Sequence, residues 1–398
     1  MIGKLQKADD RRLSILAGMG DRWRAVPKAW RVAVGCAFVL LLFALPRIYI
    51  PGVDEIIRTT KTDFTTVLFL VAMYVVVAVG LNVVIGLAGL LDLGYIGFFA
   101  VGAYTVALFG SPDSPLHGSK LATFMHTPYG WLLCVPLAVA VTMLSGVLLG
   151  WPTLRVRGDY LAIVTLGFGE IVRLVAQNAN GLTNGQRGIS DIAHPGGTWP
   201  NLLPGFIDEN WVGLPMFGSA TSLAWYWLAL VCVIVCMFAS RRLERSRVGR
   251  AWVAIREDED AAEIMGVQAF KFKLWAFAFG AALGGLAGAL YAGKQQFMGS
   301  NSFDLITSIL FVAMVVVGGA GNLAGVTVGA ILVWYLPERL RGIDFFGIEL
   351  NTGEYRLLTF GLALIVIMTF RPKGLLPKRY RSSQPPLVEA HVAEEASA

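Results

Sequence analysis

Residues Gly249–Gly266, GRAWVAIREDEDAAEIMG, are the most densely charged stretch lying between the long apolar runs of this chain. Asp258 is a suitable N-cap, acidic residues follow it in a first turn, and Gly266 is a suitable end, so the second half is predicted to form a short helix. Trp252 and Ile255 are three residues apart and share one face of the first half. A short helix between membrane spans suits docking into a groove of another protein, although an ordinary solvated helix explains the pattern equally well.

The composition places the chain among membrane proteins. Hydrophobic residues make up 56% of the chain and charged residues only 15%, whereas a soluble domain carries about 25% charged residues. Mean hydropathy is +0.62, and several apolar runs reach the length of about 20 residues that a helix needs to cross a bilayer. The sequence therefore predicts an all-α polytopic membrane protein.

The apolar runs predict about ten transmembrane helices. The predicted spans are 32–50, 66–86, 88–110, 129–150, 160–178, 222–240, 271–292, 305–318, 322–340 and 355–370. An even number of spans puts both termini on the same side of the membrane. The predicted transmembrane domain is thus 32–370, preceded by a basic segment, 1–31, and followed by a polar tail, 371–398.

The distribution of basic residues predicts the orientation. With the N-terminus in the cytoplasm, the predicted inside segments carry 23 of the 33 Lys and Arg residues and the predicted outside loops carry eight. This orientation makes the segment 241–270 cytoplasmic. The longest outside loop, 179–221, is rich in Gly, Pro and Asn and is predicted to form an irregular cap over the outer face. The tail after Arg371 is polar and is predicted to be disordered.

Two glycine-rich stretches match nucleotide-binding patterns in the wrong context. Gly288–Lys294 matches a phosphate-binding loop, but Gln295 stands where Ser or Thr would hold Mg²⁺, and no strand is predicted before it. Gly319–Ala324 matches a dinucleotide-binding pattern, yet both of its flanks are predicted spans. We predict instead that Gly319 and Gly321 form a tight hairpin between two spans.

That hairpin has a counterpart earlier in the chain. Gly86–Leu91 and Gly318–Leu323 share the pattern G-x-A-G-x-L. The match makes Gly86 and Gly89 candidate hairpin glycines as well. It also hints at an internal repeat, which is common in transporter folds.

Polar residues within the apolar runs are candidates for a translocation path, because each costs free energy in a membrane unless it is paired or hydrated. The candidates are Asn82, Asp92, Glu170, Arg173 and Asn322. Glu170 and Arg173 are three residues apart, so mutual pairing is a competing explanation. Asp92 and Asn322 can instead cap the ends of helices.

The sequence indicates no chemistry of its own. It holds no carboxylate and histidine run suited to a proton relay and no hydrolase or metalloprotease signature, so we expect no catalytic residue. The four cysteines lie in apolar runs without zinc or disulfide spacing, and no metal site is predicted.

Several stretches resemble the branched-chain amino acid permeases of the LivM type. Asp260-Ala261-Ala262-x-x-x-Gly266 resembles the E-A-A-x-x-x-G motif of ABC importer permeases, with Asp in place of Glu and without the I-x-L-P ending. Further matches are GLNVVIGLAGLLDLGYIGFFAVGAYTVAL at 80–108, GDYLAIVTLGFGEIVRLV at 158–175, SRVGRAWVAIREDEDAAEIMGV at 246–267, GGAGNLAGVTVGA at 318–330 and RPKGLLP at 371–377. In such permeases the motif forms the coupling helix that sits in a groove of the ATPase. The resemblance thereby implies coupling roles for Gly249, Arg250, Trp252, Ile255, Arg256, Asp260, Ala261, Ala262 and Gly266.

The resemblance also implies a fold type, a membrane and a set of partner proteins. It implies an importer permease of the BtuC-like (type II) kind in the bacterial cytoplasmic (inner) membrane. The implied partners are a second homologous permease, two cytoplasmic ATP-binding subunits and an extracytoplasmic substrate-binding protein. The chain itself is expected to bind no cofactor, since the partner subunits would use the ATP and Mg²⁺.

Other functions remain open at the level of the sequence. A permease of the same family could carry urea, amides or another amino acid, because selectivity lies largely in the binding protein. An ion-coupled secondary transporter would need a richer polar cluster at mid-membrane, and a membrane-embedded enzyme would need paired catalytic residues near one face.

Overall fold

A computed structural model describes residues 27–47, 63–116, 130–155, 159–195, 222–340, 361, 365, 369, 371 and 374–376. Within these ranges the chain is almost entirely helical, with one two-stranded pairing. The α-helices are α2 (Lys28–Ala44), α4 (Phe64–Leu81), α5 (Tyr95–Gly110), α7 (Gly130–Thr153), α8 (Asp159–Asn178), α9 (Asn180–Thr183), α10 (Ser222–Glu244), α11 (Arg247–Glu257), α12 (Glu259–Ile264), α13 (Ala269–Gln295), α14 (Leu305–Gly318) and α15 (Leu323–Leu340). The short elements are η1 (Leu45–Arg47), the π-helical turn η2 (Asn82–Leu87), η3 (Gly185–Arg187), η4 (Ser300–Ser302), β1 (Ile189–Ser190) and β2 (Phe297–Met298).

The long helices confirm the prediction of an all-α membrane protein. Six helices in the described part of the chain are long and apolar enough to cross a bilayer: Phe64–Leu87, Gly130–Thr153, Tyr160–Asn178, Ser222–Glu244, Ala269–Gln295 and Ser300–Gly318. Three shorter apolar helices accompany them, at Val34–Arg47, Tyr95–Gly110 and Leu323–Leu336. The predicted span 355–370 lies outside the described residues except for Gly361, Ile365 and Thr369, which are helical. The basic segment 1–31 is likewise outside them up to residue 26.

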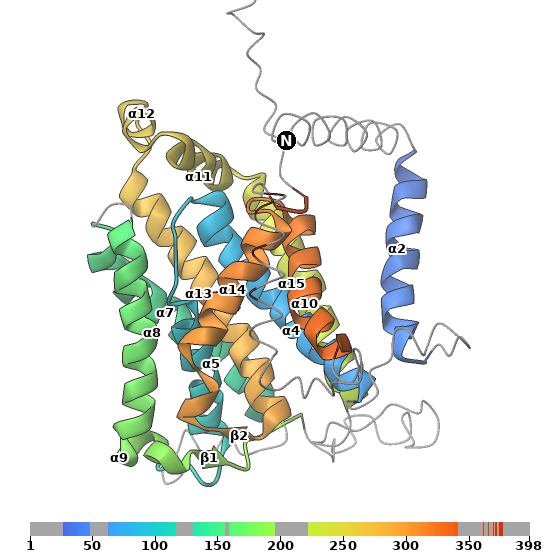
Figure 1. Ribbon diagram of the computed structural model, residues 1–398, viewed down its shortest axis with the longest axis vertical. Coiled ribbons are helices and arrows are strands. Elements are labelled where there is room, and N and C mark those ends of the chain that lie inside the picture. The colour runs from blue at the N-terminus through green and yellow to red at the C-terminus, as the bar shows by residue number, and fades with distance from the viewer. Residues whose placement is uncertain are drawn as a thin grey trace, which may run out of the picture.

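Helix α13 is the centre of the bundle and packs against α4, α5 and α7 (Figure 1). Its close approach to α5 depends on small residues, because a Cβ on Gly102 would lie only 2.4 Å from the Cα of Gly285. Small residues at such crossings let helix backbones pack closely where lipid offers no hydrophobic driving force. The glycine-rich run that mimics a phosphate-binding loop is therefore part of a packed helix.

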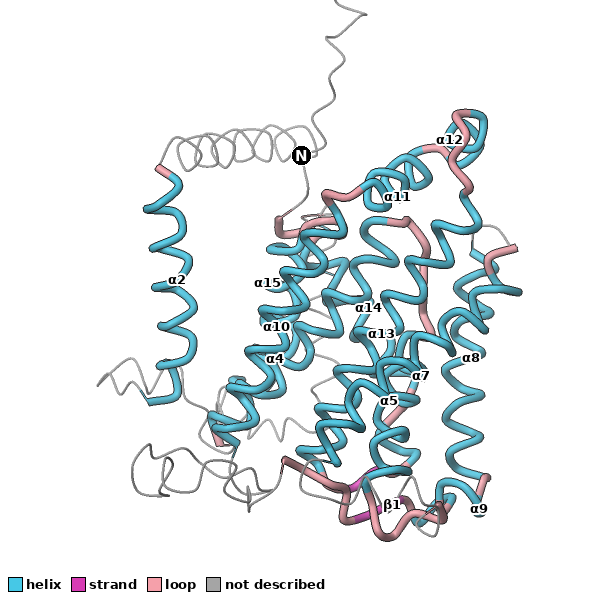
Figure 2. Tube along the Cα trace, turned by 180° about the vertical axis from the view of Figure 1, so that it is seen from behind, coloured by secondary structure: helices cyan, strands magenta, loops and turns pink. Residues whose placement is uncertain are grey.

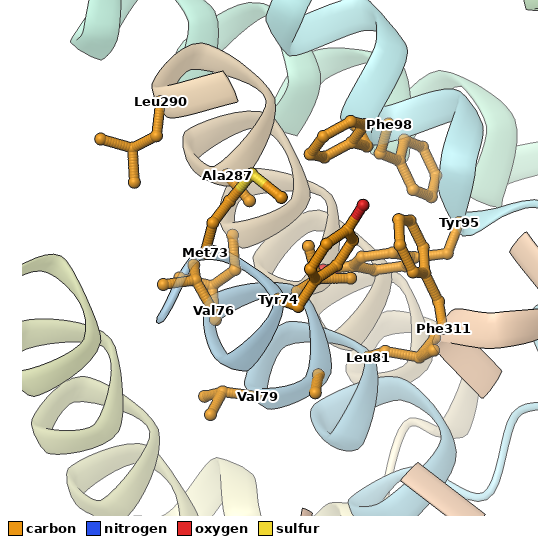
Figure 3. Packing of buried hydrophobic residues seen from close by; sticks show 14 of the residues in the cluster. Met73, Tyr74, Val76, Val79, Leu81, Tyr95, Phe98, Ala287, Leu290 and Phe311 are labelled. Carbon is orange, nitrogen blue, oxygen red and sulfur yellow. The ribbon is translucent and has the colours of Figure 1, made fainter. Parts of the chain in front are cut away.

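Aromatic side chains from α4, α5 and α14 fill the space beside α13 (Figure 3). The ring centroids of Tyr74 and Phe311 are 5.7 Å apart, and those of Tyr95 and Phe98 are 6.0 Å apart. The hydroxyl of Tyr95 also donates a 2.7 Å hydrogen bond to the carbonyl oxygen of Gly280. The start of α5 is thereby fixed to α13.

The two ends of the bundle differ (Figures 1 and 2). Helices α11 and α12 lie at one end, and α9, β1 and β2 lie at the other. At the latter end Ile189 is paired with Met298 in an antiparallel register. This strand pairing was not predicted within the loop 179–221, whose residues 196–221 lie outside the described ranges.

Strand β1 is tied to the residues that follow α5 by polar contacts. The Ser190 hydroxyl donates a 2.8 Å hydrogen bond to the carboxylate of Asp113. This bond, the weaker one from the Ser190 amide and the charge of Arg187 hold the pKa of the Asp113 carboxyl below its usual range. The described part of the loop is thus an ordered cover over this end.

Two boundaries differ from the prediction. The apolar run predicted as the span 88–110 is helical only from Tyr95, and residues 88–94 form an irregular segment. The part of the tail described at 374–376 is fixed to the bundle, because the amides of Leu375 and Leu376 donate to the carbonyl oxygens of Val317 and Gly318 at 2.8 and 3.1 Å. The prediction that the tail is disordered is therefore wrong for residues 374–376.

Candidate functional site

The charged stretch forms two consecutive helices with well-defined caps. The Ser246 hydroxyl accepts a 3.3 Å hydrogen bond from the amide of Gly249 at the start of α11. Asp258 accepts a 2.9 Å hydrogen bond from the amide of Ala261 and so caps α12, as predicted. Gly266 follows α12 with a φ of +86°, a value that favours glycine. The local prediction of a short helix between Asp258 and Gly266 is confirmed.

One face of this helix pair is built into the chain itself. The indole nitrogen of Trp252 donates a 2.7 Å hydrogen bond to the carbonyl oxygen of Phe272 at the start of α13, and the Trp252 side chain is fully buried. Ile255 and Ala262 are also buried, and they pack with Ala269. Trp252 and Ile255, predicted on a shared face, therefore lie against their own chain and are not exposed for a partner.

An ion pair fastens α12 to the same helix. The ammonium of Lys273 is paired with the carboxylate of Glu259, and only 10% of the Lys273 side chain is exposed. The exposed apolar side chains of the pair are instead Ile264, at 86%, and Met265, at 83%. Helix α12 thus presents these two side chains at its far end. Asp260 and Ala261 are exposed beside them.

Arg256, near the end of α11, joins both glycine stretches. Its Nη1 donates a hydrogen bond to the carbonyl oxygen of Gly86. Its stem lies beside Gly89, where a Cβ would lie 2.7 Å from the Arg256 Cγ. A Cβ on Gly321 would lie 3.1 Å from the Arg256 Nη1. The carbonyls in the last turn of a helix have no partner within that helix, so Arg256 caps the end of the continuous α4–η2 helix with a charge of favourable sign.

The two glycine stretches are themselves in contact, although more than 200 residues separate them. The Oδ1 of Asn82 accepts a 2.8 Å hydrogen bond from the amide of Gly321, and a Cβ on Gly86 would lie 2.4 Å from that same nitrogen. Gly319 and Gly321 have φ values of +108° and +87° and form the predicted tight turn between α14 and α15. The first stretch is not a hairpin, because Gly86 belongs to the π-helical turn η2.

Asn322 completes this junction on the other side. Its Nδ2 donates a 2.8 Å hydrogen bond to the carbonyl oxygen of Leu376, and its Oδ1 accepts from the amide of Ala324 at 3.2 Å. Asn322 therefore caps the start of α15 and holds the described part of the tail. We call the set Asn82, Gly86, Gly89, Arg256, Gly321 and Asn322 the glycine junction.

Asp92 lies in the irregular segment 88–94 and is fully buried. Its Oδ1 accepts a 2.9 Å hydrogen bond from the amide of Gly94, and its Oδ2 has no hydrogen-bond partner among the described residues. The neighbouring residue Leu93 is held on both sides of the segment. Its amide donates a 3.1 Å hydrogen bond to the Thr165 hydroxyl of α8, and its carbonyl accepts from the Ser308 hydroxyl of α14.

Glu170 and Arg173 form an ion pair on α8. The Nε of Arg173 lies 3.0 and 3.1 Å from the two carboxylate oxygens of Glu170. Their side chains are 38% and 26% exposed, so the pair lies on the surface of this chain. The structure does not bring the pair into the glycine junction. The polar candidates are therefore in three places: Asn82 and Asn322 at the junction, Asp92 in the segment 88–94, and the ion pair on α8.

Sequence reasoning missed the residues that hold these groups in place. Thr165, Ser308 and Lys273 carry no motif, and nothing in their spacing signalled these contacts. Among the residues that the structure describes, no three His, Cys, Asp or Glu side chains gather into a possible metal site.

The chain is similar to known permeases over most of its length. Residues 64–368 match the family model described as branched-chain amino acid transport system / permease component. The chain is 39% identical over 317 residues to the high-affinity branched-chain amino acid transport system permease protein LivM of Salmonella typhimurium (strain LT2), covering 77% of this chain and 68% of the relative. It is also 39% identical to LivM of Escherichia coli (strain K12) over 320 residues, with the same coverage.

A second kind of permease matches more weakly. LivH of Escherichia coli (strain K12), another branched-chain amino acid transport system permease protein, is 24% identical over 311 residues, covering 76% of this chain and 91% of the relative. No solved structure shows significant similarity. With its apolar helices and a family match over residues 64–368, the chain is a multi-pass membrane protein and belongs to the permease component family of branched-chain amino acid transport systems.

Proposed function

We propose that this chain is a translocating permease subunit of an ATP-driven importer for leucine, isoleucine and valine. The observation that carries the proposal is the pair α11 and α12. This charged pair is folded against the bundle by Trp252 and connected to the ends of membrane helices by Arg256. Such a connection suits the transmission of motion from a cytoplasmic motor. Membership of the branched-chain amino acid permease family supports the substrate class.

Helix α12 is the proposed docking element for an ATP-binding subunit. Ile264 and Met265 are 86% and 83% exposed at its tip, although apolar side chains of this size gain about 1.5–3 kcal/mol each from full burial. Anchors of this kind, laid in a groove, are how short helices are recognised. Asp260 and Glu263 border them and supply charge at the rim. The buried coupling candidates, Trp252 and Ile255 among them, would act by holding this helix in place.

The proposed setting is the bacterial cytoplasmic membrane, with ten spans of the BtuC-like (type II) kind and both termini in the cytoplasm. Arg241, Arg242, Arg245, Arg247, Arg250 and Arg256 all lie at the α11 end of the bundle or close to it. An excess of Lys and Arg is typical of cytoplasmic loops, which supports this orientation. The transmembrane domain would then be 32–370, with cytoplasmic segments at 1–31 and 371–398.

The path would run between this chain and a second homologous permease. In this arrangement two ATP-binding subunits supply ATP and Mg²⁺, and an extracytoplasmic binding protein delivers the substrate. Glu170 and Arg173 are half-exposed within the span of α8, and ionisable groups within a membrane almost always face a bundle interior or a water-filled cavity. Leucine, isoleucine and valine are zwitterions with apolar side chains, so a mostly apolar path with few polar groups suits them.

Reconstitution tests this proposal. The chain, its partner permease, the ATP-binding subunits and the binding protein are placed together in proteoliposomes. We expect accumulation of radiolabelled leucine that requires ATP and the binding protein and is inhibited by excess isoleucine or valine but not by urea. Uptake driven by an ion gradient without ATP, or inhibited by urea or an amide alone, would contradict it.

A further inference from the structure

Residues 88–94 differ from the remainder of the predicted span 88–110 in their backbone and in their exposure. Burial alternates along them, with Leu90, Asp92 and Gly94 buried and Gly89 and Leu91 exposed. Leu91 is 40% exposed, and Leu93 is intermediate. Alternation with a period of two is the signature of an extended backbone. The segment thus has an inner row and an outer row of side chains.

The segment lies well inside the bundle. Leu93 is bonded to Thr165 of α8, five residues into the span Tyr160–Asn178, and to Ser308 of α14, ten residues before the end of that helix. At 1.5 Å of rise per residue these positions are about 8 and about 15 Å from the ends of the two helices on the α11 side. Figure 1 shows the segment descending from the upper end of α4 between α8 and α14 to the start of α5.

The outer row cannot face lipid. Irregular backbone at membrane depth is tolerated only where protein buries it or where it lines a water-filled space. The exposed side of the segment has no cover from the described residues of this chain, as the exposure of Leu91 shows. Its neighbour α8 also carries the partly exposed pair Glu170–Arg173, which lipid would disfavour for the same reason. This side therefore meets a second protein or a water-filled space, and the path proposed between the two permeases supplies such a space.

The two ends of the segment are anchored to different parts of the chain, the first to α11 and the last to α13. At its start, Arg256 of α11 holds the carbonyl of Gly86 and lies beside Gly89. At its end, Tyr95 is fixed to Gly280 in the core. Gly89 has a φ of +72°, which gives the start of the segment a conformation that other residues adopt only with strain. Movement of α11 would therefore act on the first residues of the segment while its last residues stay fixed.

We propose that Leu91 and Leu93 form an apolar gate of the path on the α11 side, opened and closed when the displacement of α11 through Arg256 moves Leu91 relative to the fixed Leu93. This inference rests on the proposed transport function. Apolar constrictions close a path by excluding water, so two leucines on this irregular segment can seal it without any charged group. The bonds of Leu93 to α8 and α14 use its backbone atoms, so its side chain is free to project into the path.

A leak assay on the reconstituted complex tests the gate. Proteoliposomes loaded with radiolabelled leucine and lacking ATP should lose it about tenfold faster with Leu91→Ala and Leu93→Ala combined, a change equal to about 1.4 kcal/mol in the barrier. The matched control is Leu148→Ala on α7. The Leu148 side chain is 65% exposed, and its removal should not alter the leak. An unchanged leak in an assembled double variant overturns the gate. It leaves the proposed function intact if the unaltered complex still accumulates leucine with ATP.

A second measurement does not depend on the double variant folding. In the complex carrying Leu91→Cys, a small impermeant thiol reagent added from the α11 side should react at least about tenfold faster in one of two states, nucleotide-free or vanadate-trapped. The complex with the native cysteines gives the background rate. Equal rates in the two states overturn the gate.

Discussion

Arg256 Nη1 donates a hydrogen bond to the carbonyl oxygen of Gly86, and so joins α11 to the end of the α4–η2 helix. The acceptor lies in a π-helical turn, an element that is rare and is frequent at functional sites. The same arginine approaches Gly321 in the turn between α14 and α15. One side chain of α11 thus bonds to the end of one membrane helix and lies beside the turn that joins two others.

Replacing Arg256 should separate ATP hydrolysis from transport. A hydrogen bond from a charged group contributes about 1.5–3 kcal/mol, so Arg256→Ala should loosen α11 from Gly86 without unfolding the bundle. We expect the ATP-binding subunits to remain attached, and leucine uptake per ATP hydrolysed to fall at least about fivefold. Arg256→Lys should restore uptake only in part, because an ammonium lacks the planar fork of a guanidinium.

The matched control is Arg247→Ala, which removes an exposed arginine from the first turn of the same helix. Uptake per ATP should not change in this variant. If Arg256→Ala retained full coupling, α11 would not transmit motion through the glycine junction.

Trp252 should be the main stabilising residue of the α11–α12 pair. It is fully buried and donates to the carbonyl of Phe272, so Trp252→Ala removes apolar packing and leaves that carbonyl without its donor. Large-to-small substitutions of this kind cost about 3–5 kcal/mol. We expect a clear fall in the thermal midpoint of the purified complex and weaker retention of the ATP-binding subunits. Trp275→Ala, on a side chain that is 53% exposed, serves as the control and should change the midpoint little.

The pair Glu170–Arg173 should tolerate an exchange of its members. Both charges remain three residues apart on α8 in the variant with Glu170→Arg and Arg173→Glu, so they can pair again. We expect most of the uptake to persist, normalised to assembled complex, whereas Glu170→Ala alone should reduce the amount of folded protein. An unpaired charge in a membrane helix costs about 2.5–3.5 kcal/mol on insertion scales. Loss of uptake in the assembled exchange variant would instead assign the pair a direct role in the path.

The sequence was sufficient for features that depend on local pattern. The spans 305–318 and 322–340 differ from α14 and α15 by at most one residue, because a glycine turn with positive φ interrupts one long apolar run there. The cap at Asp258 and the end at Gly266 also follow from side-chain chemistry within a few residues. These features need no knowledge of the remaining chain.

Features that depend on contacts between distant residues could not be predicted from the sequence. Hydropathy does not distinguish an apolar helix from an apolar extended segment, so the interruption at 88–94 was missed. The bonds that hold it come from Thr165 and Ser308, two hydroxyls without any motif. The spacing of Trp252 and Ile255 placed them correctly on one helix face. It could not show whether that face contacts a partner protein or the start of α13.

The orientation is open to a labelling test. Gly181 is exposed in α9 with no side chain or backbone within 4 Å of a Cβ built on it, and Glu257 is exposed at the end of α11. A single cysteine at position 181 should react with an impermeant thiol reagent on intact cells, and one at position 257 should react only after the membrane is opened. Reaction of position 257 on intact cells would invert the topology and remove α11 and α12 from the cytoplasm.

The tip of α12 should decide whether the ATP-binding subunits stay attached. Gly266 has a φ of +86° and open space around its Cα, so Gly266→Val meets no clash but strains the backbone by about 1–3 kcal/mol. Asp260 lies in the first turn of α12, where its charge favours the helix by about 0.3–1 kcal/mol, so Asp260→Lys should weaken it. Both variants should insert and bind the partner permease, yet retain fewer ATP-binding subunits.

Met265→Gln removes the exposed apolar anchor without placing a charge at the C-cap of α12, and should loosen the ATP-binding subunits more than either change. Co-purification of the ATP-binding subunits and substrate-stimulated ATP hydrolysis in proteoliposomes measure these effects. Lys271→Ala serves as the control, because Lys271 is exposed on α13 and should leave both quantities unchanged. If all three variants at the tip retained full binding and coupled uptake, α12 would be a solvated loop helix. The glycine junction would then receive no motion from an ATP-binding subunit through α12.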